Sequence, residues 1–273
     1  MEKHPRTNAL LKSILFWIVF LFLLIASGML SSFFPPKLSR LLYAPFEAIG
    51  AFIATWLFIK FEKISFKDIG LIWEPGTVLR FIKGFGIGAI IFALILFALL
   101  SLTDLHIQLN SRGISNATLL GCLTLLPLAL MEEVGFRAYS FLELNKVFGL
   151  RVTQLITALA FGSYHVLNGW SVYTSFTGPF VWAFVFGLSA IWSRGISMPT
   201  GIHVALNIGQ LLSGTNGNVN SVWKIYYASK ADLARTAHIG LALQIIVLIC
   251  AVGLTEVFIR KNKSLSTLSK KAF

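Results

Sequence analysis

The sequence predicts an all-α protein, a polytopic transmembrane helical bundle of about eight spans. Of its 273 residues, 56% are hydrophobic and only 12% are charged, and the mean hydropathy is +0.78. Soluble domains carry about 25% charged residues, so this composition argues against a soluble fold. Apolar runs as long as a membrane is thick recur along the chain, with basic residues between them.

Eight apolar runs are predicted to be membrane spans. We place them at 13–34, 41–61, 82–102, 117–144, 152–168, 172–193, 197–214 and 237–259. The first run has no convincing small-residue cleavage site and a second run follows closely, so a retained helix is expected instead of a signal peptide. The fourth and seventh runs are the weakest because polar residues interrupt them. Together the spans are expected to form a single membrane domain over residues 1–273.

Basic residues between the runs predict the orientation. If the N-terminus is cytoplasmic, the inner segments hold 16 Lys and Arg residues and the outer segments hold 6. Cytoplasmic loops are enriched in these residues, so both termini are expected in the cytoplasm. The segment 62–84 is amphipathic and basic and is expected along the inner membrane surface. The segment 215–235 is polar and is expected to be an external loop. The topology accounts for the net charge of +12, so no nucleic-acid partner is expected.

Few ionisable groups interrupt the apolar runs. At membrane depth such a group costs about 2.5–3.5 kcal/mol on the insertion scale, and it marks a functional site by default. In the fourth, fifth and seventh runs we single out five ionisable groups and one asparagine: Glu132, Glu133, Arg137, His165, His203 and Asn207. Glu256 lies near the end of the eighth run and is expected to pair with Arg260, four residues later.

Helical spacing separates the charges of the fourth run. Glu133 and Arg137 are four residues apart and share a helix face, so they can neutralise each other. Glu132 lies about 100° around the helix and is free to face another element. In the seventh run, His203 and Asn207 are also four residues apart and point in one direction.

The polar groups of the three runs are predicted to lie at one depth. Counted from the nearest basic residue on the inner side, Glu132, His165 and Asn207 are 13 or 14 residues into the membrane. At 1.5 Å per residue this is about 20 Å, and His203 lies about 14 Å in. Structural ion pairs, core histidines or a transport pathway would also place such groups in spans. Their common depth favours a shared site.

The group has the chemistry for hydrolysis. Glu132 can act as a general base toward water, His165 can position that water or pass a proton, and His203 with Asn207 can donate hydrogen bonds to an oxyanion. A zinc site is the variant, with Glu132, His165 and His203 as three ligands and water as the fourth. The sequence has no HExxH motif. Spacing across three helices does not show whether these side chains bind a metal, so metal dependence stays open at this point.

Three short motifs resemble those of the CPBP intramembrane protease family, also called the CAAX protease or Abi family. That family has EExxxR, FxxxH and HxxxN in this order on separate spans. Here they read "EEVGFR" (132–137), "FGSYH" (161–165) and "HVALN" (203–207). The resemblance covers residues 117–214 and implies that these spans form the catalytic core. Many members have glycine directly after the arginine, where this chain has Ala138.

The resemblance implies an intramembrane endopeptidase that cleaves a membrane-associated peptide or protein. It implies that Glu132 and His165 activate water and that His203 and Asn207 form the oxyanion site. Glu133 and Arg137 would support them, as would Phe161 of the second motif. The family has been described both as metal-dependent and as glutamate-based. We favour the metal-free mechanism because it matches the asparagine, so no cofactor is favoured.

The compact chain is similar to the bacterial branch of the family. A bacterial cell membrane is therefore expected, with roles such as bacteriocin immunity or peptide maturation, and prenylated substrates are not expected. The family also contains members without hydrolytic activity. The alternative is thus a non-enzymatic membrane module, which would be a transporter, an immunity protein or a regulatory scaffold.

Overall fold

The computed structural model describes residues 4–271 except 112, 216, 218 and 219, and for 263–271 it describes the backbone only. Lys3 and Arg112, which count toward the predicted charge bias, lie outside the described residues. Helices dominate the described chain, which confirms the all-α membrane bundle. In chain order the elements are α1 (Pro5–Ser32), α2 (Pro36–Glu62), the 3-10 helix η1 (Phe66–Ile69), α3 (Thr77–Leu102), β1 (Leu105–Leu109), α4 (Asn116–Arg137), α5 (Tyr139–Phe148), α6 (Leu150–Leu167), α7 (Val172–Thr177), α8 (Pro179–Ser193), α9 (Ser197–Ser213), β2 (Trp223–Tyr227) and α10 (Lys230–Lys271).

Each predicted span coincides with a helical segment. Six segments of the described chain are long and apolar enough to cross a membrane: α1, α2, α3, α4 with α5, α7 with α8, and α10 as far as Asn262. The other two, α6 and α9, have 18 and 17 residues. At 1.5 Å per residue they are about 26 Å long, slightly less than the hydrocarbon core of about 30 Å. These two shorter helices carry the FxxxH and HxxxN motifs.

Two of the predicted spans are broken. The span 117–144 is interrupted at Ala138, whose backbone angles (φ −95°, ψ −104°) are not helical. The span 172–193 is interrupted at Gly178, directly before Pro179. The second break has a plain cause, since proline cannot donate a backbone hydrogen bond and disfavours the helical conformation in the residue before it.

The predicted external loop 215–235 is partly wrong. It contains the strand β2, and α10 begins within it at Lys230. β2 pairs antiparallel with β1, with Leu105 opposite Tyr227 and Leu109 opposite Trp223. The β-branched and aromatic residues of both segments favour extended backbone, and neither segment is long enough to signal a strand by periodicity alone.

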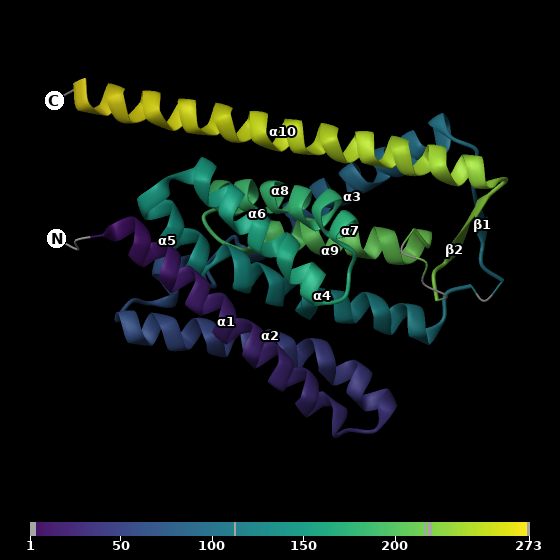
Figure 1. The fold of residues 1–273 in the computed structure, drawn as a ribbon, viewed down its shortest axis with the longest axis horizontal. Helices are drawn as coiled ribbons and strands as arrows, with labels where there is room; N and C mark the ends of the chain where they lie inside the picture. Colours follow the sequence, from purple (N-terminus) through teal and green to yellow (C-terminus); the bar gives the residue numbers. More distant parts are fainter. Residues whose placement is uncertain (1–3, 112, 216, 218–219, 272–273) are drawn as a thin grey trace.

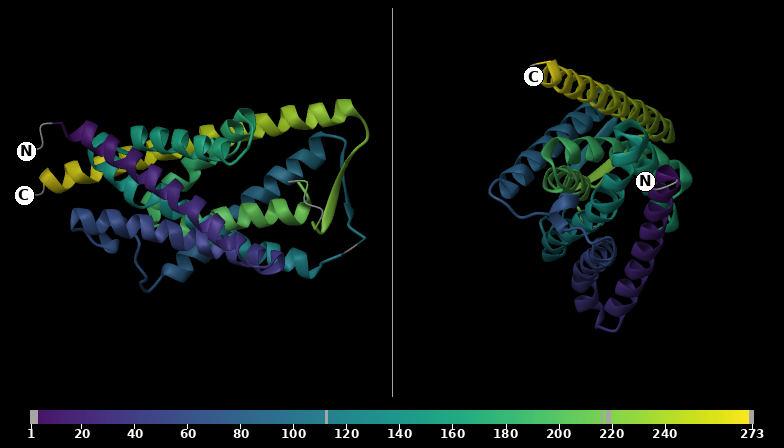
Figure 2. Two further views of the ribbon diagram at one scale, coloured as in Figure 1. Left: turned by 60° about the horizontal axis from the view of Figure 1, so that its bottom comes forward. Right: turned by 90° about the vertical axis from the view of Figure 1, so that its left-hand side faces the viewer.

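The helices form three groups, and the central group carries the three motifs (Figure 1). α1 and α2 form a hairpin on one side, α10 lies on the opposite side, and α4, α6, α8 and α9 lie between them, an arrangement that the end-on view also shows (Figure 2). The N- and C-termini lie at the same end of the bundle and the small sheet lies at the other. This agrees with the expectation that both termini face one side of the membrane. That this side is the cytoplasm stays a prediction.

Aromatic side chains join α1 to the central helices. Phe20 of α1 packs edge-on against Phe136 of α4, with ring centroids 5.7 Å apart. Phe136 in turn contacts Phe161 of α6 at 5.0 Å. All three rings are buried. This cluster fixes α4 relative to α6 next to the polar motifs.

Candidate active site

The two glutamates of the first motif lie near the end of α4 and point in different directions. Residues that are adjacent in a helix are about 100° apart around its axis. The side chain of Glu133 is accordingly 0% exposed, whereas that of Glu132 keeps 15% of its surface exposed. The accessible edge of Glu132 opens into a cavity, and Glu133 faces the protein interior.

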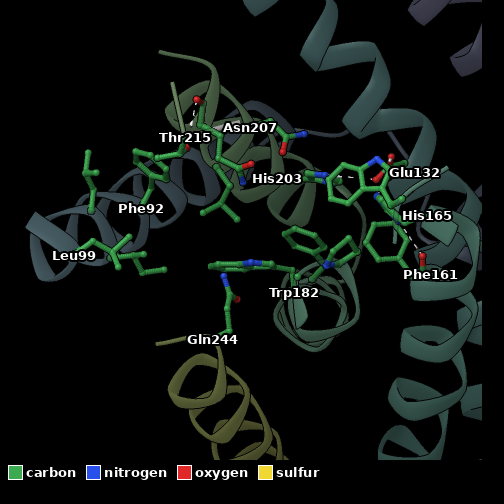
Figure 3. Close-up of a pocket in the computed structure, with 18 residues that line it drawn as sticks. Phe92, Leu99, Glu132, Phe161, His165, Trp182, His203, Asn207, Thr215 and Gln244 are labelled. Carbon is green, nitrogen blue, oxygen red and sulfur yellow. Dashed lines mark hydrogen bonds and ion pairs between the residues drawn. The ribbon is translucent and has the colours of Figure 1, made fainter. Parts of the chain in front are cut away.

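Glu132 lies between two histidines from other helices (Figure 3). Its Oε1 is 4.0 Å from Nε2 of His165, and its Oε2 is 3.5 Å from Nε2 of His203. Both separations exceed the roughly 2.7–3.2 Å of a direct N–H···O hydrogen bond. A water that bonds to both Glu132 and His165 fits a gap of this length.

The ring of His165 is oriented by its own helix. Its Nδ1 lies 2.9 Å from the backbone oxygen of Phe161, one turn earlier on α6. A carbonyl oxygen only accepts hydrogen bonds, so Nδ1 carries the hydrogen and donates it. In the neutral ring, Nε2 then presents its lone pair toward Glu132. The four-residue spacing of the second motif therefore sets the tautomer of the histidine.

The ring of His203 is oriented by Glu133. Nδ1 of His203 donates to Oε1 of Glu133 across 2.9 Å. The ring also stacks on Phe186 of α8, with centroids 4.6 Å apart and planes 17° apart. Nε2 is left facing Glu132 and the cavity. Because Nδ1–H donates to Glu133, Nε2 carries a hydrogen only when both ring nitrogens are protonated.

Arg137 is paired with Glu133, as the spacing of the first motif predicts. Nε of Arg137 is 3.5 Å from Oε2 of Glu133, and both side chains are 0% exposed. The guanidinium N–H groups have no hydrogen-bond partner among the described residues. Instead, the guanidinium carbon lies 4.3 Å from the ring centroid of Phe161 and 5.1 Å from that of Phe186. The cation is thus held by one carboxylate and by the faces of aromatic rings.

The cavity beside Glu132 has a volume of about 380 Å³. This is in the usual range of ligand sites, about 300–1,000 Å³. All four predicted catalytic residues line it, including Asn207, which lies one turn after His203 on α9 (Figure 3). The structure therefore brings together the residues that the sequence groups by depth. The remaining lining residues are mostly apolar: Phe92, Ile95, Leu96, Leu99, Phe161, Trp170, Gly178, Pro179, Trp182, Phe186, Leu206, Gln210, Thr215 and Gln244.

Sequence reasoning missed three residues near or behind the site. Phe186 stacks on both His203 and Arg137, but it is one of 24 phenylalanines and nothing in its pattern separates it from the others. Trp170 contacts the ring of His165 at 5.1 Å and comes from the segment after α6. Glu47 of α2 is only 3% exposed and does not line the cavity. The depth rule that singles out Glu132 would have found Glu47 in its apolar run.

A catalytic zinc site needs three protein side chains that converge on one point. Among the described residues there is no group of three or more His, Cys, Asp or Glu side chains arranged to hold a metal ion. Glu132, His165 and His203 therefore do not fit the ligand set that the zinc variant needs, and we derive no step through a metal.

A search of curated proteins found no match to the chain. A family model does match it: residues 114–209 fit the type II CAAX prenyl endopeptidase Rce1-like family. The matched segment runs from the start of α4 into α9 and contains all three motifs and every residue discussed around Glu132 except Glu47. This segment therefore resembles the CPBP, or CAAX protease, family of membrane endopeptidases.

Proposed function

We propose that this protein hydrolyses a peptide bond of a membrane-associated peptide or protein, with residues 117–214 as its catalytic core. The match to an endopeptidase family supports the reaction class. The observation that carries the proposal is the position of Glu132. Its carboxylate opens into the cavity and directs one oxygen toward His165 and the other toward His203.

In this proposal the reacting water lies between Glu132 and Nε2 of His165. Glu132 accepts a proton from the water as the water oxygen attacks the peptide carbonyl carbon. The lone pair on Nε2 accepts a hydrogen bond from the second O–H of the water, which stays intact, and so aims the water oxygen. When the tetrahedral intermediate collapses, Glu132 returns the proton to the leaving amine. The carboxylate is regenerated, and no proton is gained or lost by the site.

The proposed oxyanion site lies on α9. Nε2–H of His203 and the side-chain amide of Asn207 are one helical turn apart on the cavity wall. Two such donors can bind the negative oxygen that forms as the carbonyl is attacked. In a cavity with mainly apolar walls, these hydrogen bonds are stronger than they would be in water.

We place the protein in a bacterial cell membrane, surrounded by lipid, with a membrane peptide as its substrate. The similarity to bacterial members supports bacteriocin immunity or peptide maturation as the role. Comparing the membrane proteomes of cells that carry the wild type and the Glu132→Ala variant would identify the substrate, as peptides whose length differs between the two.

The test of the mechanism compares one Glu→Gln substitution inside the cavity with one outside it. Glu132→Gln keeps the size of the side chain and removes the base, so cleavage of the identified peptide should fall by about 10²- to 10⁴-fold. Glu143→Gln makes the same change at a side chain that is 12% exposed and does not line the cavity. It should leave the rate unchanged. Purified protein in lipid nanodiscs is suitable for both assays. Cleavage by Glu132→Gln within threefold of the wild-type rate would contradict the proposal.

A second outcome would favour the non-enzymatic alternative. If Glu132→Gln, His165→Ala and Asn207→Ala each leave the cellular phenotype intact while the proteins remain inserted, the chain acts as a transporter, an immunity protein or a scaffold.

A further inference from the structure

The cavity extends well beyond Glu132, into an arm between α3, α9 and α10 (Figure 3). This arm begins past His203 and Asn207. Its apolar wall includes Leu96 and Leu99 of α3, and Gln244 of α10 lies at its other side. None of the three motifs contributes to this arm, so the proposed chemistry does not explain it.

Glycines on α3 and α9 determine where the arm forms. A Cβ atom on Gly84 of α3 would lie 2.2 Å from the backbone oxygen of Met198, and one on Gly88 would lie 2.5 Å from that of Ile202. The two backbones are therefore in direct contact there. Further along, the neighbour of Gly209 on α9 is the ring of Phe92, not the backbone of α3. The axes of α3 and α9 therefore separate enough to fit the ring of Phe92 between them. The arm of the cavity lies past this ring.

Gln244 gives the arm a polar feature. Its Oε1 is buried and has no hydrogen-bond partner among the described residues. The side chain points from α10 toward Trp182 and the cavity (Figure 3). A buried carbonyl oxygen without a donor is unfavourable, and no solvent in a lipid environment would relieve it. The amide nitrogen faces Trp182 in Figure 3, and a half-turn of the amide places the buried Oε1 there instead. With that rotation the arm suits a ligand that brings an N–H group.

We propose that this arm binds the extended backbone of the substrate on one side of the scissile bond. One backbone N–H of the peptide donates to Oε1 of Gln244, and an apolar side chain of the peptide packs against Leu96 and Leu99. An acyl or prenyl chain would fill the same apolar space but has no hydrogen to donate, so Gln244 favours a peptide. The inference rests on the proposed function, because it assigns the cavity to the substrate of that reaction.

The test combines a change in Gln244 with a change in the peptide. The probes are short Leu- and Phe-containing peptides with a fluorescent reporter and quencher, each N-methylated at a different backbone amide. Gln244→Met keeps the length of the side chain and removes the acceptor. We expect it to raise KM about tenfold with little change in kcat, as for the loss of one hydrogen bond made in the ground state and transition state alike.

One N-methylated peptide should show a similar rise in KM with the wild type, and no further rise with Gln244→Met. Gln244→Glu keeps an acceptor oxygen and should restore much of the binding. Ile249→Ala alters a residue of α10 that is 65% exposed on the outer surface and serves as the matched control. An unchanged KM for Gln244→Met, or equal N-methyl effects in the wild type and this variant, would overturn the proposal.

A binding experiment separates this inference from the proposed function. Glu132→Gln protein is titrated with the same peptides, without their quencher, and binding is followed by fluorescence anisotropy. Weaker binding on addition of Gln244→Met supports the arm even if the wild type cleaves none of the probes, in which case the proposed function fails alone. Cleavage without any dependence on Gln244 refutes the arm alone. Tighter binding of a prenyl-chain probe to Gln244→Met would assign the arm to lipid and would also refute it.

Discussion

Replacing Arg137 with methionine tests how much the buried ion pair of Glu133 and Arg137 contributes to the stability of the protein. Methionine keeps most of the length and the apolar contact with Phe161 and Phe186, but it removes the charge. Glu133 would then be a fully buried carboxylate whose remaining partner is Nδ1 of His203. We therefore expect Arg137→Met to be strongly destabilising, although Arg137 itself does not line the cavity.

The expected magnitude follows from the separation of the two charges. Nε of Arg137 and Oε2 of Glu133 are 3.5 Å apart. With an effective dielectric constant of about 20, Coulomb's law gives an attraction of about 5 kcal/mol. Removing one partner of a buried pair typically costs about 3–5 kcal/mol because the other charge is left uncompensated. For a chain of this size, such a loss corresponds to a fall in Tm of roughly 6–20 °C.

The assay is thermal unfolding of the purified protein in detergent, followed by the fluorescence of its tryptophans. The double variant Glu133→Gln with Arg137→Met removes both charges and should recover a large part of the lost Tm. If Arg137→Met unfolds within about 2 °C of the wild type, the pair does not hold the site together. If the double variant is as unstable as the sum of the two single variants, the two residues are not coupled, and the reasoning fails.

Two further predictions concern helix packing and metal dependence. Gly84→Ala should destabilise the protein by about 1–3 kcal/mol, because the new methyl group meets the backbone of α9, whereas Gly86→Ala, which would meet no atom within 4 Å, should leave Tm unchanged or slightly raised. Thermal unfolding checks both. Peptide cleavage should survive dialysis against EDTA, since Glu132 and His165 can activate water between them. Loss of activity that added Zn²⁺ restores would contradict the metal-free mechanism.

Much of the fold could be predicted from hydropathy because a membrane span requires a long run of apolar residues. The breaks at Ala138 and Gly178 were harder to foresee. Both segments are apolar enough on average to count as single spans, so hydropathy does not locate the breaks. Pro179 was a local signal for the second break. At the first break, the Gly135 oxygen accepts a hydrogen bond from Trp17, a contact between residues 118 positions apart that no local pattern reveals.

The candidate site was predictable to the extent that helical geometry determines it. Spacing in one helix pairs Glu133 with Arg137, and depth groups Glu132 with His165. The contacts that orient the histidines come from elsewhere. That Glu133 also binds His203 could not be read from one helix, because it depends on how α4 and α9 pack. The stacking of Phe186 on His203 is of the same kind.

The break at Ala138 also shows that the family segment is not an autonomous unit. The backbone oxygen of Gly135 accepts a hydrogen bond from the indole nitrogen of Trp17, 3.2 Å away, and Phe20 packs directly on Gly135. Both aromatic residues belong to α1, which precedes the matched segment by more than 80 residues. Excised or transplanted by itself, the segment 114–209 would lose this donor and retain only the longer bond from the Ser140 hydroxyl, at 3.4 Å, on the Gly135 oxygen. A minimal enzyme built on this chain must therefore retain its first helix.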